Sequence, residues 1–314
     1  MADKIATREA YGNALAELGA LNKDVVVLDA DLAEATKTIS FKKKFPDRFF
    51  DCGIAENNMM SVAAGLATTG KIPFASTFAM FAAGRSFDQV RNSIGYPHLN
   101  VKICATHGGV SVGEDGATHQ CCEDMALMRT IPGMVVMNPS DAIEARCAVE
   151  AAIKHNGPVY VRFGRLPVSI INDNPEYKFE IGKGVKLADG NDVTIVANGL
   201  MVERALEARE LLREEGISAS VINMHTVKPL DTQLLIAEAQ QTGAIVTTEE
   251  HNVLGGLGSA VAEALSEVCP VPVIKHGVPD QFGKSGAGKD LLEYFGLNAQ
   301  GIVEKVKLAL TLKK

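Results

Sequence analysis

Apolar runs alternate with stretches of helical spacing through the first half of the chain. Residues 25–28 (VVVL) and 101–105 (VKICA) are short and mainly apolar, as is typical of parallel strands buried on both faces. Residues 5–21 and the stretch from Ala55 to a stop at Gly70 have helical composition. This alternation of strands and helices predicts an α/β domain built on a mostly parallel sheet.

A second unit of the same kind fills the C-terminal part of the chain. Residues 192–199 and 244–251 are predicted strands, and 201–216 is a strongly amphipathic helix. Between the two units, residues 172–190 are rich in Asn, Pro, Gly and charge, which indicates a linker with a short extended piece. We therefore expect an α/β protein of two domains, 1–171 and 191–314, each a mostly parallel sheet flanked by helices.

Composition restricts the function classes that need consideration. The chain has 314 residues, of which 46% are hydrophobic and 22% charged, with a net charge of -7. This acidity argues against a nucleic-acid surface, and no long apolar run or signal peptide is found, so we expect a cytoplasmic protein without membrane contact. The six cysteines lack CxxC spacing, which favours reduced thiols over disulfides or zinc ligands.

One carboxylate lies at a predicted junction between a strand and a helix. Residues 49–52 (FFDC) are expected to end a strand, and Gly53 permits the turn into the helix. Glu56 then falls in the first helical turn, where an acid complements the positive end of the helix dipole. The small residues around it (GIAENNMMSVAAG) also indicate a ligand site.

The GIAEN segment and its small-residue helix resemble the thiamine-diphosphate glutamate segment of the transketolase family, in the C-terminal half of that protein. The resemblance implies that Glu56 hydrogen-bonds the pyrimidine ring nitrogen of the cofactor and promotes proton loss from its thiazolium carbon. Phe78 and Phe81 are three residues apart, and core packing is the ordinary role of such a pair. The resemblance instead assigns Phe81, with Phe78 beside it, to stack on the aminopyrimidine. It also implies that Asp31 helps to form the cofactor pocket at a subunit interface.

Two positions depart from the family pattern. Ala35 stands where relatives carry a phosphate-binding serine, and the adjacent Thr36 could substitute only with a different side-chain direction. Gly84 stands where full-length transketolases usually have a third aromatic residue. We expect this second change to widen the edge of the pocket or to leave that edge to a partner chain.

A polar, glycine-rich loop follows the predicted strand at 101–105. Such loops hold ligands in α/β proteins more often than they serve the core. His107, Asp115 and His119 are all able to bind zinc. Zinc is the less favoured interpretation, because HExxH-type spacing is absent and the intervening glycines disfavour a regular helix.

The loop sequence GEDGATHQ matches the transketolase pattern almost residue for residue. By that match, Asp115 binds a donor-sugar hydroxyl, His119 contacts the hydroxyls of the reacting two-carbon unit, and His107 acts at the acceptor or phosphate end. A neutral imidazole suits proton transfer near pH 7. The resemblance also implies that Arg8 and Arg165 bind the substrate's phosphate, for which the guanidinium fork is suited.

A complete transketolase also needs a half that binds diphosphate, with a GDG-type loop and a downstream asparagine that hold magnesium. This chain contains neither, and the resemblance covers essentially all of it. We therefore expect the C-terminal subunit of a split transketolase of the pentose phosphate pathway. Its N-terminal partner would hold the diphosphate of thiamine diphosphate and Mg2+ (or Ca2+), in a heterotetramer with two copies of each subunit. The expected reaction moves a two-carbon ketol unit from a ketose phosphate to an aldose phosphate.

Two other functions stay open. The beta subunit of a 2-oxo-acid dehydrogenase shares both domains and the cofactor glutamate, although Asp115, His119 and the paired arginines favour a phosphorylated polyol. A non-catalytic interaction subunit would keep only the fold, but it would have no physical need for the whole set of site residues.

A phosphate-loop pattern near the C-terminus is not expected to bind nucleotide. Residues 283–290 (GKSGAGKD) fit GxxxxGK, but Asp290 replaces the Ser or Thr that would hold magnesium. We expect no strand before this segment, and a helix at 291–295 with Asp290 near its N-terminus.

Overall fold

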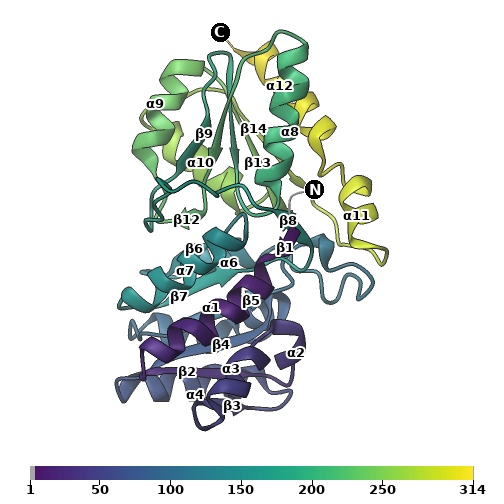
Figure 1. Ribbon diagram of the computed structural model, residues 1–314. Helices are drawn as coiled ribbons and strands as arrows, with labels where there is room; N and C mark the ends of the chain where they lie inside the picture. The colour runs from purple at the N-terminus through teal and green to yellow at the C-terminus, as the bar shows by residue number, and fades with distance from the viewer. Residues whose placement is uncertain (1–3, 314) are drawn as a thin grey trace.

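A largely parallel sheet forms the centre of the first domain (Figure 1). The computed structural model describes residues 4–313, so residues 1–3 and 314, at the ends of the two expected domains, lie outside it. Within the described range the sheet has seven strands, which run parallel except for β12, which is antiparallel to β6. In spatial order they are β12 (Thr226–Lys228), β6 (Val135–Met137), β7 (Val159–Arg162), β5 (Lys102–Thr106), β4 (Ile72–Phe78), β2 (Val25–Asp29) and β3 (Phe49–Asp51).

Helices cover both faces of this sheet, as the apolar strands require. Successive residues of a strand point to opposite faces: Val26 and Leu28 belong to one core cluster, whereas Val25 and Val27 belong to another. The α-helical and π-helical segments of the first domain are α1 (Thr7–Leu21), α2 (Ala33–Thr36), α3 (Ile39–Lys44), α4 (Glu56–Thr68), a π-helical segment (Met80–Arg85), α5 (Phe87–Gln89), a second π-helical segment (Val90–Gly95), α6 (Asp124–Arg129) and α7 (Ala142–Lys154).

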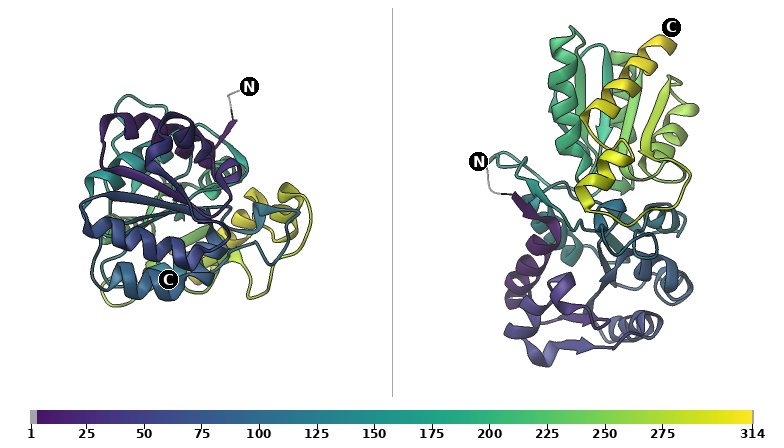
Figure 2. Two further views of the ribbon diagram at one scale, coloured as in Figure 1. Left: turned by 90° about the horizontal axis from the view of Figure 1, so that it is seen from below. Right: turned by 90° about the vertical axis from the view of Figure 1, so that its right-hand side faces the viewer.

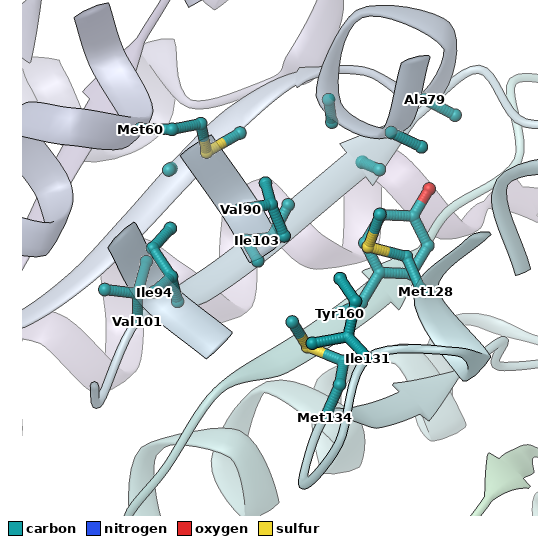
Figure 3. Packing of buried hydrophobic residues seen from close by; sticks show 14 of the residues in the cluster. Met60, Ala79, Val90, Ile94, Val101, Ile103, Met128, Ile131, Met134 and Tyr160 are labelled. Carbon is teal, nitrogen blue, oxygen red and sulfur yellow. The ribbon is translucent and has the colours of Figure 1, made fainter. Parts of the chain in front are cut away.

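The core under α4 is shown in Figure 3. Met60 from α4, Val90 and Ile94 from the second π-helical segment, and Ile103 from β5 all belong to one fully buried cluster. Burial of this kind stabilises the domain by roughly 1.5–3 kcal/mol for each large apolar side chain. It also fixes the start of α4 relative to the ends of the strands, where Glu56 lies.

The second domain is built on a separate sheet. In spatial order its strands are β14 (Val273–Val278), β13 (Ile245–Asn252), β10 (Val193–Ala197), β11 (Ala219–Asn223) and β9 (Val185–Ala188), with only β9 antiparallel to its neighbour. The helices around it are α8 (Met201–Glu214), α9 (Thr232–Thr242), α10 (Leu257–Ser266), α11 (Gly288–Tyr294) and α12 (Ala299–Leu312). The predicted fold class, two α/β domains with mostly parallel sheets, is confirmed.

The boundary between the two domains does not coincide with the linker predicted at 172–190. Strand β9 lies inside that range and pairs with β11, so the second sheet begins before residue 191. Strand β12 comes from the second domain's sequence but pairs with β6 in the first sheet. Near the N-terminus, β1 (Lys4–Ala6) pairs with β8 (Pro167–Ser169) in a two-stranded ribbon.

A buried ion pair ties the two domains together. Arg162 of β7 donates from Nε to Asp124 Oδ2 at 2.9 Å, and from Nη2 to the backbone carbonyl of Glu250 in the second domain at 2.9 Å. Tyr160 donates its hydroxyl to the same Asp124 oxygen at 2.8 Å. Since a buried charge needs both a counter-charge and hydrogen bonds, this arrangement holds β7 against β13.

The phosphate-loop pattern at 283–290 has a different setting from the one expected. The expectation that no strand precedes it is wrong, because β14 ends at Val278, a few residues upstream. The predicted helix start is confirmed, since Asp290 lies in the first turn of α11. Among residues 4–313, no helix is long and apolar enough to span a membrane.

Candidate active site

Most of the predicted site residues lie at or beyond the carboxyl ends of parallel strands in the first sheet, whereas Arg8 lies in the first turn of α1. Asp31 follows β2, Glu56 follows β3, Phe78 ends β4, His107 follows β5 and Arg165 follows β7. Loops at this edge of an open parallel sheet are where α/β proteins bind ligands. Neighbouring strands thus bring together residues that are far apart in the sequence.

Glu56 begins α4, in the first helical turn as predicted. Its side chain is only 2% exposed, and Arg85 donates from Nη1 to both carboxylate oxygens, at 2.9 and 2.8 Å. The Arg85 guanidinium carbon also lies 4.4 Å from the centroid of the Phe81 ring. Arg85 therefore balances the buried charge and covers the predicted stacking surface, a role that sequence reasoning missed.

Aromatic rings connect the predicted cofactor residues to the predicted substrate residues. Phe78 and Phe81 are stacked with centroids 5.8 Å apart and ring planes at 14°. His119 meets Phe81 edge-on at 5.3 Å, and His107 stacks on Phe78 at 3.9 Å. The two histidines and two phenylalanines form one continuous, mostly buried cluster, which is linked to Glu56 through Arg85.

The contacts of His107 fix its protonation state. A guanidinium only donates hydrogen bonds, so the contact of 3.2 Å between Arg8 Nη1 and Nε2 makes Nε2 an acceptor. The ring proton is then on Nδ1, which donates to Thr106 Oγ1 at 2.8 Å. Burial, followed by the charges of Arg8 and Arg165, lowers the pKa of His107 to about 3.

A ring with that pKa is a poor proton acceptor near pH 7. This favours a neutral hydrogen-bonding role for His107, and the proton-transfer role expected from the sequence stays a prediction. The backbone is consistent with a constrained position, since His107 has φ of 58°, which is uncommon for a residue with a side chain.

The two predicted phosphate arginines converge near His107. Arg8 donates from Nη1 to the carbonyl of Ala35 at 2.8 Å, while its Nε is buried without a hydrogen-bond partner among the described residues. Arg165 donates to Glu114 at 2.8 Å and to the carbonyl of Val112. Burial, and next the charge of Arg165, lower the pKa of Arg8, which indicates that the two guanidinium groups lie close together.

The remaining predicted residues are less tightly held. His119 is half-buried, and its Nδ1 lies 2.9 Å from Thr118 Oγ1. Asp115 is exposed within the glycine-rich loop. Asp31 is also exposed, has φ of 62°, and donates its backbone N–H to Asp51 at 3.2 Å. Among the residues that the structure describes, no three His, Cys, Asp or Glu side chains are grouped as metal ligands would be.

The structure shows the surroundings of the two positions that depart from the family pattern. Thr36 does not replace the missing serine, because its buried hydroxyl donates to Asp29 Oδ2 at 2.7 Å. A side-chain carbon at Gly84 would overlap the Met80 methyl group, and the expectation that Gly84 widens the pocket edge or leaves it to a partner chain stays a prediction. Met80 thus fills the space beside Gly84.

A cavity of about 960 Å3 opens beside this cluster. Met80, Thr118 and Gln120 line it from the first domain, and residues 280–283 line it from the second. The glycine-rich loop therefore lines one side of the cavity, and the second domain lines another.

The chain belongs to the transketolase family. Residues 3–169 match the transketolase pyrimidine binding domain, and residues 182–302 match the transketolase C-terminal domain. Together these matches cover most of the chain, so both predicted domains correspond to known transketolase domains.

Individual relatives agree with this assignment. The chain is 46% identical over 297 residues to the 6-deoxy-6-sulfo-D-fructose transketolase subunit SqwH of Clostridium sp. (strain MSTE9), covering 94% of this chain and 92% of that protein. It is 39% identical over 312 residues to human transketolase, covering 98% of this chain but only 50% of the human protein. A solved structure described as a split gene transketolase, inactive beta4 tetramer, shares 56% identity and a TM-score of 0.91, and covers 99% of this chain and 100% of that one.

Proposed function

We propose that this chain is the C-terminal subunit of a two-chain, thiamine diphosphate-dependent transketolase. The complex transfers a two-carbon ketol unit from a ketose phosphate to an aldose phosphate. The observation that carries the proposal is the convergence of Glu56, the Phe78–Phe81 pair, His107 and Arg8 at one edge of the first sheet. The likeness to a split-gene transketolase over that chain's whole length, and to human transketolase over half its length, supports the two-chain arrangement.

The residues present fit the pyrimidine half of thiamine diphosphate. A flat ring with a basic nitrogen needs an aromatic face and a buried carboxylic group, and Phe81 and Glu56, which both contact Arg85, offer these two groups. Arg85 occupies both oxygens of Glu56, but its side chain is 48% exposed, and in the proposal it moves aside when the cofactor binds. When bound, the cofactor supplies the carbon nucleophile that ketol transfer requires. Glu56 holds the ring nitrogen, and Phe81 and Phe78 hold the ring face.

Other side chains of this chain bind and orient the sugar in the proposal. Arg8 has a buried Nε without a partner among residues 4–313, so it has a donor free for a phosphate oxygen. His107 remains neutral and presents a hydrogen-bonding ring beside it. His119 and Asp115 bind hydroxyl groups of the donor sugar, and Arg165 adds positive charge at the phosphate end.

The remaining parts of the proposal come from the partner. An N-terminal subunit holds the diphosphate and Mg2+ (or Ca2+), and two copies of each subunit form a cytoplasmic heterotetramer. Asp31, exposed on the loop after β2, faces the subunit interface and completes the cofactor pocket.

Reconstitution tests the proposal. The gene next to this one is searched for a chain with a GDG-type loop, and the two chains are purified separately and then mixed with thiamine diphosphate and Mg2+. We expect the mixture to convert a ketose phosphate and an aldose phosphate into the transferred pair, with each chain inactive alone. Strong turnover by the single chain would contradict the two-chain arrangement.

The same reconstitution separates the rival functions. A beta subunit of a 2-oxo-acid dehydrogenase would consume pyruvate and charge a lipoyl acceptor, leaving ketose phosphate unchanged. A non-catalytic interaction subunit would bind the partner without turnover of either substrate. The sugar itself needs a panel of substrates, since a close relative is named for a sulfosugar.

A further inference from the structure

The second domain touches the glycine-rich loop at residues 107–122 through a hydrogen-bonding glutamine. Gln120 is 4% exposed, and its Nε2 donates to the carbonyls of Val110 at 3.1 Å and Gly113 at 3.2 Å within the loop. Its shortest bond, 2.7 Å, is to the carbonyl of Lys284 in the segment that precedes α11. One side chain therefore holds the loop in shape and attaches it to the second domain.

The two segments approach at backbone distance. A side-chain carbon at Gly288 would lie 2.6 Å from the carbonyl oxygen of Ser111, and one at Gly116 would lie 2.5 Å from Ser285 Oγ. In Figures 1 and 2 the yellow segment around α11 lies against the edge of the first domain. At position 288 only glycine permits so close an approach to a backbone atom.

Strand β13 of the second domain holds both ends of the same loop. The backbone N–H of Ser111 donates to Glu250 Oε1 at 2.6 Å, and the backbone N–H of Asn252 donates to the carbonyl of Cys122 at 2.8 Å. With Lys284, this gives the second domain three separate hydrogen-bonded attachments along residues 111–122. Asp115 and His119 lie between these attachments.

We propose that the second domain positions the loop that carries Asp115 and His119, and that Gln120 is the positioning residue which links the two. This inference rests on the proposed function, because it takes those two residues to bind the donor sugar. The second domain then has two roles: it holds this loop in place, and it contributes residues to the wall of the cavity that Met80 also lines. Glu56 and Phe81 lie on other elements, and none of the three attachments involves either residue.

Two variants disturb the contact from opposite sides. Gln120→Ala removes the three donated hydrogen bonds, and Gly288→Ala pushes a methyl group against Ser111 from the second domain. Gly286→Ala is the matched control: it lies in the same segment, but its added carbon would meet only Leu291 of its own domain, at 3.3 Å.

Hydrogen exchange on the purified full chain is measured first, because it needs no activity. We expect backbone amides in peptides covering residues 107–122 to exchange at least about tenfold faster in Gln120→Ala and Gly288→Ala than in the wild type or Gly286→Ala. Peptides covering α4 should be unchanged. Unchanged exchange of the loop in both test variants overturns the proposal.

Steady-state kinetics on the reconstituted complex supply the second readout. We expect the KM for the donor sugar to rise roughly tenfold in both test variants, with the affinity for thiamine diphosphate unchanged. Equal losses of cofactor affinity and sugar affinity would mean that Gln120 only stabilises the fold, which overturns the positioning role. A wild-type complex that turns over no sugar would contradict the proposed function, while the exchange result still decides whether the second domain holds the loop.

Discussion

Arg85 donates from a single nitrogen to both carboxylate oxygens of Glu56, at 2.9 and 2.8 Å. The carboxylate is 2% exposed, whereas the arginine is 48% exposed. The pair thus joins a buried acid at the start of α4 to a cation that solvent can reach. We therefore expect mutation of Glu56 to affect mainly activity, and mutation of Arg85 to affect mainly stability.

Removal of the acid should remove catalysis. In Glu56→Gln the amide keeps the shape of the side chain but cannot exchange a proton with the cofactor ring, so we expect activity of the reconstituted complex to fall about a thousandfold or more. Assembly with the partner should be unchanged by size-exclusion chromatography. Asp290→Asn, another first-turn acid, should retain full activity. A Glu56→Gln complex with wild-type turnover would leave Glu56 only as a helix-dipole acid.

Removal of the cation should cost stability. Arg85→Ala leaves the buried Glu56 carboxylate without its counter-charge, and we expect the free energy of unfolding to fall by about 1–2 kcal/mol, discounted because Arg85 is half-exposed. When Glu56 is already replaced by Gln, Arg85→Ala should leave the free energy of unfolding almost unchanged. Urea unfolding of the four proteins in this double-mutant cycle measures the coupling. Additive losses would show that the ion pair contributes no stability.

The fold followed from patterning because the strands are buried on both faces. All five residues of β2 and all five of β5 are buried, so their apolar runs carried a clear signal. The sequence of strand β12, in contrast, does not indicate which sheet the strand joins. Its three residues lie in the second domain's sequence, and their pairing with β6 depends on how the domains pack.

The candidate site was predicted less completely, and for a similar reason. Glu56 and His107 lie at strand ends in recognisable motifs, so the resemblance located them. Arg85 and Gln120 have ordinary sequence surroundings, and their importance comes from partners that the fold brings within reach. The low pKa of His107 likewise depends on its burial and on Arg8, a neighbour 99 positions away in the sequence.

The two arginines should distinguish phosphorylated from plain sugars. Arg8→Ala or Arg165→Ala removes a charge-assisted contact worth about 1.5–3 kcal/mol, so the KM for a ketose phosphate should rise roughly ten- to a hundredfold. Arg8 should matter more, since Arg165 is already paired with Glu114. Steady-state kinetics with one sugar, with and without its phosphate, measure the effect.

The sugar without its phosphate is the internal control for this prediction. We expect its KM to be nearly the same in the wild type and in both arginine variants. Thr36 donates to Asp29 and does not replace the serine absent at Ala35, so discrimination by the wild type should be weaker than in full-length transketolases. Equal losses for both substrates would mean that the arginines hold the loop or the interface. The sugar's far end would then be recognised elsewhere.

Glu250 should make the stability of the chain depend on pH. Burial raises the pKa of Glu250 to about 7, although the charge of Arg162 opposes the increase. A raised carboxyl pKa means that the folded chain holds this proton more tightly than the unfolded chain. Its stabilising contribution is therefore fully present below the ordinary value of 4.5 and is lost as the pH rises through 7.

Glu250→Gln imitates the protonated side chain at every pH and keeps an oxygen to accept the Ser111 N–H. We therefore expect the variant to gain stability relative to the wild type between pH 4.5 and pH 8, by up to about 3 kcal/mol in the difference of their unfolding free energies. Urea unfolding at several pH values across this range measures that difference. Glu267→Gln, an exposed acid of the same domain, is the matched control for the loss of one carboxylate. A flat difference for Glu250→Gln would show that Glu250 is charged in the folded chain throughout the range, with Arg162 compensating its burial in full.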